Sequence, residues 1–222
     1  MMNFILSPSI LAADCCILGQ QIKEVDEAGA EYIHIDVMDG IFVPSISYGM
    51  NVISSLRKST AKVFDVHIMI TDPIRYIKEF VNAGADIITF HLEAAQDPQA
   101  VIDRIHSFGI KAGISIKPGT DVSALEPFLD KVDMILIMTV EPGFGGQKLI
   151  PESFERVKKL KKMLLEKNLT TDIEVDGGIT LDNVGDIVDA GANVVVAGSA
   201  VFKGDITENV KSFMNILHKK NI

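Results

Sequence analysis

The stretch Tyr32-Ile-His-Ile-Asp-Val-Met-Asp-Gly40 decides which fold this chain of 222 residues predicts. Its β-branched and aromatic residues predict a buried strand, and Asp39-Gly40 indicates a turn at the end of it. Side chains two residues apart share one face of a strand, so His34, Asp36 and Met38 should point to the same side. Burying a histidine beside an aspartate is costly unless both have partners. The partner is either a bound metal ion or a hydrogen bond within a packed core.

Strand and helix signals alternate along the rest of the chain. The first strand should begin at Phe4 and give way to a polar loop by Leu11. After the strand that begins at Tyr32, the other predicted strands cover 63–69, 86–91, 110–116, 134–138, 172–175 and 193–197. Predicted helices cover 17–28, 48–58, 72–84, 98–108, 124–129, 151–166, 181–190 and 206–217.

This alternation favours an α/β fold with a parallel sheet, closed into a (β/α)8 TIM barrel. The motif Ala-Gly-Ala supports a count of eight strand–helix units. It recurs at Gly29, Gly84 and Gly191, and these separations are close to two and then four such units. The alternative is an open doubly wound sheet, but its usual Gly-x-Gly-x-x-Gly after the first strand is absent. We expect residues 1–222 to form one barrel domain.

The composition is that of a globular protein, with 47% hydrophobic and 23% charged residues. No run of eighteen apolar residues predicts a membrane span, and the segment Met1–Ile5 does not predict a signal peptide. The two cysteines, Cys15 and Cys16, are adjacent, which makes a bridge between them improbable. We interpret them as small apolar residues, and we expect a reduced, cytoplasmic protein.

The net charge of −9 argues against nucleic acid and anionic membranes as partners. A phosphorylated small molecule stays compatible with this charge, because backbone N–H groups at helix N-termini can hold a phosphate without basic side chains.

Polar residues gather where a barrel carries its chemistry, at the carboxyl ends of the strands. His34 and Asp36 end the second strand, His67 ends the third, and Asp176 follows the seventh. Two imidazoles and two carboxylates from three strands could converge on one divalent metal ion, and this mixed set suits zinc, iron, manganese or cobalt.

Glycines cluster after three consecutive predicted strands. Approachable backbone N–H groups in such loops could hold a phosphate. Tight turns that need a positive φ are the other explanation for each cluster. The clusters are Gly143, Gly145 and Gly146, then Gly177 and Gly178, then Gly198 with Ser199.

A metal ion beside a phosphate site suggests a sugar phosphate as the small-molecule substrate, because a metal can polarise a carbonyl and stabilise an enediolate. Asp36 and Asp176 could then remove and return a proton from opposite sides. Three methionines would give the reacting centre an apolar lining, although each could equally be barrel core. They are Met38, Met69 and Met138.

The chain resembles the ribulose-phosphate 3-epimerase family over nearly its whole length. The motifs that carry the resemblance are Ser7-Pro-Ser-Ile-Leu-Ala-Ala-Asp14, His34-Ile-Asp-Val-Met-Asp-Gly-Ile-Phe-Val-Pro44, Asp65-Val-His-Ile-Met69, Met138-Thr-Val-Glu-Pro-Gly-Phe-Gly-Gly-Gln147, Glu174-Val-Asp-Gly-Gly-Ile179 and Gly198-Ser-Ala-Val-Phe202. The resemblance implies a barrel of the ribulose-phosphate-binding type, in a homo-oligomer that is a dimer or a hexamer. It also implies interconversion of D-ribulose 5-phosphate and D-xylulose 5-phosphate, a step of the pentose phosphate pathway.

The resemblance implies a role for each candidate residue. One divalent ion, zinc before iron, manganese or cobalt, would be held by His34, Asp36, His67 and Asp176. Asp36 would be the base and Asp176 the acid in one direction, with the roles exchanged in the other. Substrate and phosphate would be contacted by Ser9, His67, Gly143, Phe144, Gly145, Gly146, Gly177, Gly178, Gly198 and Ser199.

Other functions stay open. A sister epimerase of a six-carbon ketose phosphate, of the allulose 6-phosphate type, would share the metal and both aspartates. A Schiff-base aldolase would use Lys117 as its nucleophile. A sugar-phosphate binding protein would need no acid–base pair. His91 and Glu93 are interpreted as groups that support the site or fill the core.

Overall fold

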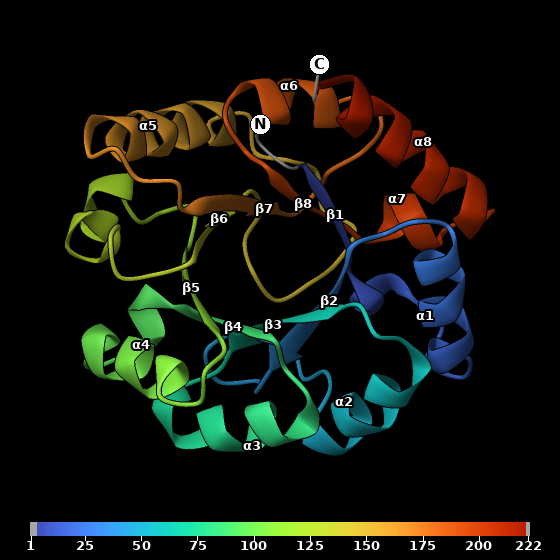
Figure 1. Ribbon diagram of the computed structural model, residues 1–222, viewed down its shortest axis with the longest axis horizontal. Coiled ribbons are helices and arrows are strands. Elements are labelled where there is room, and N and C mark those ends of the chain that lie inside the picture. The colour runs from blue at the N-terminus through green and yellow to red at the C-terminus, as the bar shows by residue number, and fades with distance from the viewer. Residues whose placement is uncertain (1–3, 221–222) are drawn as a thin grey trace.

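The computed structural model describes residues 4–220, which form a parallel β-barrel surrounded by helices (Figure 1). The strands are β1 (Ile5–Pro8), β2 (Tyr32–Met38), β3 (Val63–Met69), β4 (Ile87–His91), β5 (Lys111–Ile116), β6 (Met134–Met138), β7 (Asp172–Asp176) and β8 (Val194–Ala197). Each begins within two residues of its predicted start, because runs of β-branched residues between turn signals mark them well.

Helices connect the strands and cover the outside of the barrel (Figure 1). They are α1 (Leu18–Glu27), α2 (Met50–Leu56), α3 (Ile77–Ala83), α4 (Pro98–His106), α5 (Ser153–Glu166), α6 (Val184–Asp189), α7 (Ser199–Phe202) and α8 (Ile206–Lys220). The helix predicted over 124–129 is instead a 3-10 helix, Val122–Phe128, because the ring of Pro127 would clash with the carbonyl four residues before it in an α-helix. The short helix α7 was not predicted.

The sheet closes on itself in the order β1-β8-β7-β6-β5-β4-β3-β2. Between β1 and β2 the closure is thin. It consists of a parallel bridge between Ser9 and His34 and a hydrogen bond of 3.3 Å from the Glu31 N–H to the Leu6 carbonyl. The predicted (β/α)8 barrel is confirmed, and the open doubly wound sheet is excluded. That residues 1–222 form one domain stays a prediction, since residues 1–3 and 221–222 lie outside the described part.

The barrel interior changes from apolar to polar along its axis. An apolar cluster of Ile5, Ile87, Met134 and Val194 lies at the amino ends of the strands. Above it, the outward residues of each strand pack against the helices, whereas inward positions carry polar groups, as the period-two pattern of β2 predicted. Figure 1 shows the loop after β6, in yellow, lying across the barrel centre in that view.

The register between β2 and β3 sets the inward side chains in layers. His34 lies beside Asp65, and Asp36 lies beside His67. One layer higher, Met38 lies beside Met69. The polar residues of the two strands are therefore brought together by strand pairing alone.

Cys15 and Cys16 are exposed, free thiols, so their interpretation as apolar residues is wrong: they lie in the loop before α1, outside the packed core. Within residues 4–220, every helix is too short or too polar to cross a bilayer.

Candidate active site

A cavity of about 560 Å³ opens at the carboxyl ends of the strands. Its floor includes Asp36 and Asp176. The three predicted methionines line it and are nearly inaccessible to solvent, with 5%, 1% and 2% exposure for Met38, Met69 and Met138. The floor therefore sets two carboxylates in an apolar surround.

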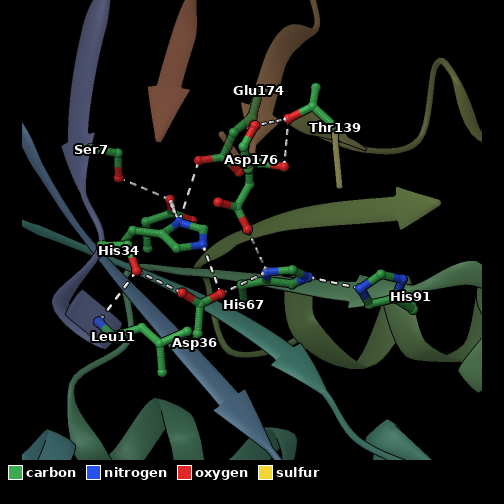
Figure 2. Close-up of polar contacts among 12 residues, drawn as sticks. Ser7, Leu11, His34, Asp36, His67, His91, Thr139, Glu174 and Asp176 are labelled. Carbon is green, nitrogen blue, oxygen red and sulfur yellow. Dashed lines mark hydrogen bonds and ion pairs between the residues drawn. The ribbon is translucent and has the colours of Figure 1, made fainter. Parts of the chain in front are cut away.

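The four predicted metal ligands lie together, with Asp36 and Asp176 in this floor and the two histidines beneath it (Figure 2). Asp36 Oδ1 is 3.3 Å from His34 Nε2 and 3.2 Å from His67 Nδ1. Asp176 Oδ2 approaches His67 Nδ1 to 3.9 Å. One ligand atom from each residue lies within 4.8 Å of all the others. Strand pairing brings the first three together, and β7 brings Asp176 to them.

This cluster could hold a metal ion. His34 Nε2 is buried, faces Asp36 and has no hydrogen-bond partner. An unpartnered buried nitrogen is costly unless a ligand satisfies it. Two imidazole nitrogens and two carboxylates form a donor set that suits zinc and other divalent transition metals. The residues present therefore fit a divalent ion.

A second polar layer supports His34 from below, and the sequence interpretation missed it. His34 Nδ1 donates to Asp65 Oδ2 at 2.7 Å, and the Ser7 hydroxyl donates to the same oxygen at 3.1 Å. Glu174 Oε1 is 3.6 Å from His34 Nδ1 (Figure 2). The signal was available, since Asp65 and Glu174 each stand two residues before a predicted ligand and share its face.

The two carboxylates on the cavity floor differ in proton affinity. Burial opposes ionisation of Asp36, but the neighbouring His34 outweighs it and holds the pKa of Asp36 well below its ordinary value. Burial lowers the pKa of His34, yet the charges of Asp65 and Asp36 raise it well above its ordinary value. Burial, aided by the charge of Asp36, raises the pKa of Asp176 to about 7. One carboxylate is thus ready to accept a proton while the other holds one.

The Ser9 hydroxyl holds the carboxylate of Asp36, and Thr139 holds the backbone of Asp176. Ser9 donates to Asp36 Oδ2 at 2.7 Å and lines the cavity. Thr139 donates its backbone N–H to the carbonyl of Asp176 at 2.8 Å, and its hydroxyl lies 2.8 Å from the same oxygen. The first contact limits the movement of the Asp36 carboxylate, and the second fixes the backbone that carries the Asp176 side chain.

His67 contacts a further histidine on the side away from the cluster. Its Nε2 lies 2.9 Å from Nε2 of His91, whose Nδ1 lies 3.4 Å from Glu93 Oε2. Burial lowers the pKa of His91 to about 4, so this ring is neutral. Burial favours the neutral form of Glu93, but hydrogen bonds from His91, Thr120 and the Lys117 N–H lower its pKa to about 2.

The predicted glycine loops form the wall of the cavity opposite β2 and β3. A Cβ on Gly177 would lie 2.3 Å from Val140, and one on Gly178 would lie 2.2 Å from the Leu149 nitrogen, so both positions require glycine. Within the described residues, Lys148 has the only cationic side chain in the lining. The predicted residues in this wall are Gly143, Phe144, Gly145, Gly146, Gly177, Gly178, Gly198 and Ser199.

Two predicted residues lie elsewhere. His67, also predicted to contact substrate, is fully buried beneath the floor and is not part of the cavity lining. Lys117, the nucleophile of the aldolase alternative, is not part of it either; its Nζ lies 3.8 Å from the ring centre of Phe42.

Comparison with known proteins gives a consistent picture. The model of the ribulose-phosphate 3 epimerase family matches residues 5–202. The chain is 48% identical to ribulose-phosphate 3-epimerase of Synechocystis sp., over 90% of this chain and 88% of that protein. It is 46% identical to the Bacillus subtilis protein of the same name, over 89% of this chain and 91% of that protein.

Solved structures of low sequence identity share the fold alone. The structure of KGPDC from Streptococcus mutans superposes with a TM-score of 0.71 at 14% identity and covers 99% of both chains. A tryptophan synthase α-subunit from Pyrococcus furiosus superposes with a TM-score of 0.71 at 16% identity, over 99% of this chain and all of that one.

The family model and the two epimerase sequences each extend over most of this chain. The chain therefore belongs to the ribulose-phosphate 3-epimerase family.

Proposed function

We propose that this enzyme interconverts D-ribulose 5-phosphate and D-xylulose 5-phosphate by inverting the configuration at C3. The observation that carries the proposal is the pair Asp36 and Asp176, which face one cavity from β2 and β7 with opposite protonation preferences. Family membership, and the names of the relatives, support the choice of a five-carbon substrate.

Inversion requires that a proton leave C3 on one face and return on the other. Asp36, ionised and held by the Ser9 hydroxyl, would accept the proton from one epimer. Asp176, whose affinity for a proton is increased by burial and by the charge of Asp36, would deliver a proton to the opposite face. In the reverse direction the two groups exchange roles. The apolar methionine lining keeps water from competing for these protons.

The cluster beneath the floor would assist by holding a divalent ion. His34, Asp36, His67 and Asp176 are its proposed ligands, supported by their convergence and by the unpartnered nitrogen of His34. When bound, such an ion polarises a carbonyl and offsets the negative charge that develops on substrate oxygens as C3 loses its proton. We propose zinc for this ion, before iron, manganese or cobalt, because two nitrogens and two oxygens suit tetrahedral zinc.

The glycine wall would hold the phosphate. Gly177, Gly178, Gly198 and Ser199 line the cavity, as do Phe144 and its flanking glycines, and their backbone N–H groups would bind the phosphate oxygens. A phosphate bound this way needs no cluster of basic side chains, in keeping with the net charge of −9. We also propose that the protein works in the cytoplasm, as a homo-oligomer.

Proton exchange at C3 tests the proposal. The zinc-loaded protein is incubated in deuterium oxide with D-ribulose 5-phosphate, or with the six-carbon analogue D-allulose 6-phosphate, and followed by NMR. We expect D-xylulose 5-phosphate that carries deuterium at C3. Turnover of the six-carbon substrate alone would contradict the five-carbon assignment, and the absence of exchange with both would contradict epimerisation.

A further inference from the structure

The two proposed ligand histidines are held by different partners. His34 directs Nε2 toward Asp36 and donates from Nδ1 to a carboxylate, Asp65, at 2.7 Å. His67 has the opposite orientation. Its Nδ1 faces the carboxylates of Asp36 and Asp176, and its Nε2 meets another histidine, His91, at 2.9 Å (Figure 2).

The contact between the two Nε2 atoms has room for one hydrogen. If His67 offers the lone pair of Nδ1 to a cation, its proton must lie on Nε2 and point to His91. Nε2 of His91 is then the acceptor, so the ring hydrogen of His91 lies on Nδ1. That nitrogen faces Glu93 Oε2 at 3.4 Å and has no closer partner among the described residues.

Glu93 is itself held in place by the loop after β5. Its Oε1 accepts from the Lys117 N–H at 2.8 Å and from the Thr120 hydroxyl. This loop is in turn fixed by Arg156, whose guanidinium donates to the Pro118 and Thr120 carbonyls at 2.7 Å each. The Glu93 carboxylate is thus anchored to a loop whose backbone Arg156 holds in place.

Packing fixes the ring between these groups. His91 is fully buried, and its ring centre lies 5.0 Å from that of His67, with 28° between the planes. On its other side the ring of Phe42 lies 4.9 Å away. The ring of His91 therefore has little freedom to turn, and its Nδ1 stays directed toward Glu93.

We propose that Glu93 and His91 are positioning residues: Glu93 orients His91, and His91 holds His67 as the tautomer that directs a free Nδ1 lone pair toward the cation. The inference rests on the proposed function, because it presupposes that His67 is a ligand. It assigns His91 a task distinct from filling the core. Partners of this kind fix ligand orientation and raise ligand basicity in metal sites.

Tautomers observed by NMR test the inference on the wild-type protein. Histidine labelled with 15N is followed by long-range proton–nitrogen correlation in the zinc-loaded protein. We expect zinc at Nδ1 of His67, a proton on its Nε2, and a proton on Nδ1 of His91. Zinc uptake with a proton on Nε2 of His91 would overturn this inference and leave the proposed metal site intact. A protein that takes up no zinc would overturn both.

Zinc affinity of three variants gives a second test. In a competition titration with a coloured chelator, His91→Leu, which removes the acceptor, should weaken zinc binding about 10- to 100-fold. His91→Gln, whose amide oxygen can accept from His67, should recover part of the loss. Glu93→Gln, which keeps the shape of the side chain but removes its charge, should weaken zinc binding less than His91→Leu does.

The chain offers a matched control in His106, an exposed histidine whose Nε2 lies 2.9 Å from Asp133 Oδ2 beyond the amino ends of the strands. His106→Gln should leave zinc affinity unchanged. Thermal unfolding of each metal-free variant separates loss of fold from loss of affinity. Equal zinc affinity in wild type, His91→Leu and His91→Gln, or equal losses in the two His91 variants, would overturn the inference.

Discussion

The two sides of the barrel mouth are built from different kinds of residue. On β2 and β3, ionisable side chains occupy interior strand positions, are almost fully buried and are held by a second polar layer. After β6, β7 and β8, the wall consists of glycine-containing loops. At two positions, Gly177 and Gly178, no residue with a side chain would fit. The difference matches two tasks: proton transfer needs side chains in fixed places, whereas an anion can be held by an exposed backbone.

Asp176 belongs to both sides, since it ends β7 and precedes Gly177. Replacing it therefore tests the division most severely. Asp176→Asn removes a proton carrier and weakens a proposed metal ligand, so we expect turnover to fall by about 10²- to 10⁴-fold with the barrel still folded. Steady-state kinetics measure the turnover, and thermal unfolding shows whether the barrel is folded. The exposed Asp182 gives the control Asp182→Asn, and near-normal turnover of Asp176→Asn would show that the role is wrongly assigned.

The glycine wall should respond in KM rather than in turnover. Gly178→Ala would bring a Cβ to 2.2 Å from the Leu149 nitrogen at a φ of +68°, so the loop must move. We expect KM to rise about tenfold or more while kcat changes less, because the loss concerns phosphate binding. Gly119→Ala is the matched control, since nothing lies within 4 Å of its added Cβ. A pure loss of kcat would count against the division of tasks.

Metal affinity should depend on pH through the protons that the proposed ligands must release. The pKa of Asp176 is raised to about 7 and that of His34 is raised well above its ordinary value, so both groups keep their protons to higher pH than usual. A metal ion must displace those protons, and zinc affinity should therefore fall as the pH is lowered from 8 to 6, by up to about tenfold per unit for each proton. Titrations at several pH values measure the slope, which Asp176→Asn should reduce; an unchanged slope would refute the assignment.

The smallest effect is expected from Ser9, which touches the catalytic pair through one hydrogen bond of 2.7 Å to Asp36. Ser9→Ala should cost about 0.5–1.5 kcal/mol in transition-state stabilisation, a loss of turnover of about tenfold at most. Steady-state kinetics at saturating substrate would show it. A loss as large as that of Asp176→Asn would mean that Ser9 itself carries a proton.

Much of the barrel could be predicted from local sequence. The alternation of His34, Asp36 and Met38 marked the inward face of β2, and the glycines marked the loops, since both signals act over a few residues. The 3-10 helix Val122–Phe128 and the short helix α7 were missed or misjudged because so few residues carry little periodicity.

The support of the site could not be predicted in the same way. That Asp65 orients His34 depends on the register between β2 and β3, and that Glu93 faces His91 depends on how the loop after β5 packs. The contacts on which both depend, His34 with Asp65 and the Lys117 N–H with Glu93, join residues that are far apart in the sequence. The acidic residues two positions before His67 and Asp176 are nevertheless a usable local sign of a supporting layer.

The central claim is that two aspartates serve opposite faces of the substrate, and exchange of the C3 hydrogen in paired variants tests it most directly. Asp36→Asn and Asp176→Asn, each confirmed to hold zinc, are incubated in deuterium oxide with D-ribulose 5-phosphate and, separately, with D-xylulose 5-phosphate. NMR then reports deuterium at C3. We predict that each variant exchanges the hydrogen of one epimer without converting it, and that the two variants choose different epimers. Exchange of the same epimer by both variants would contradict the account.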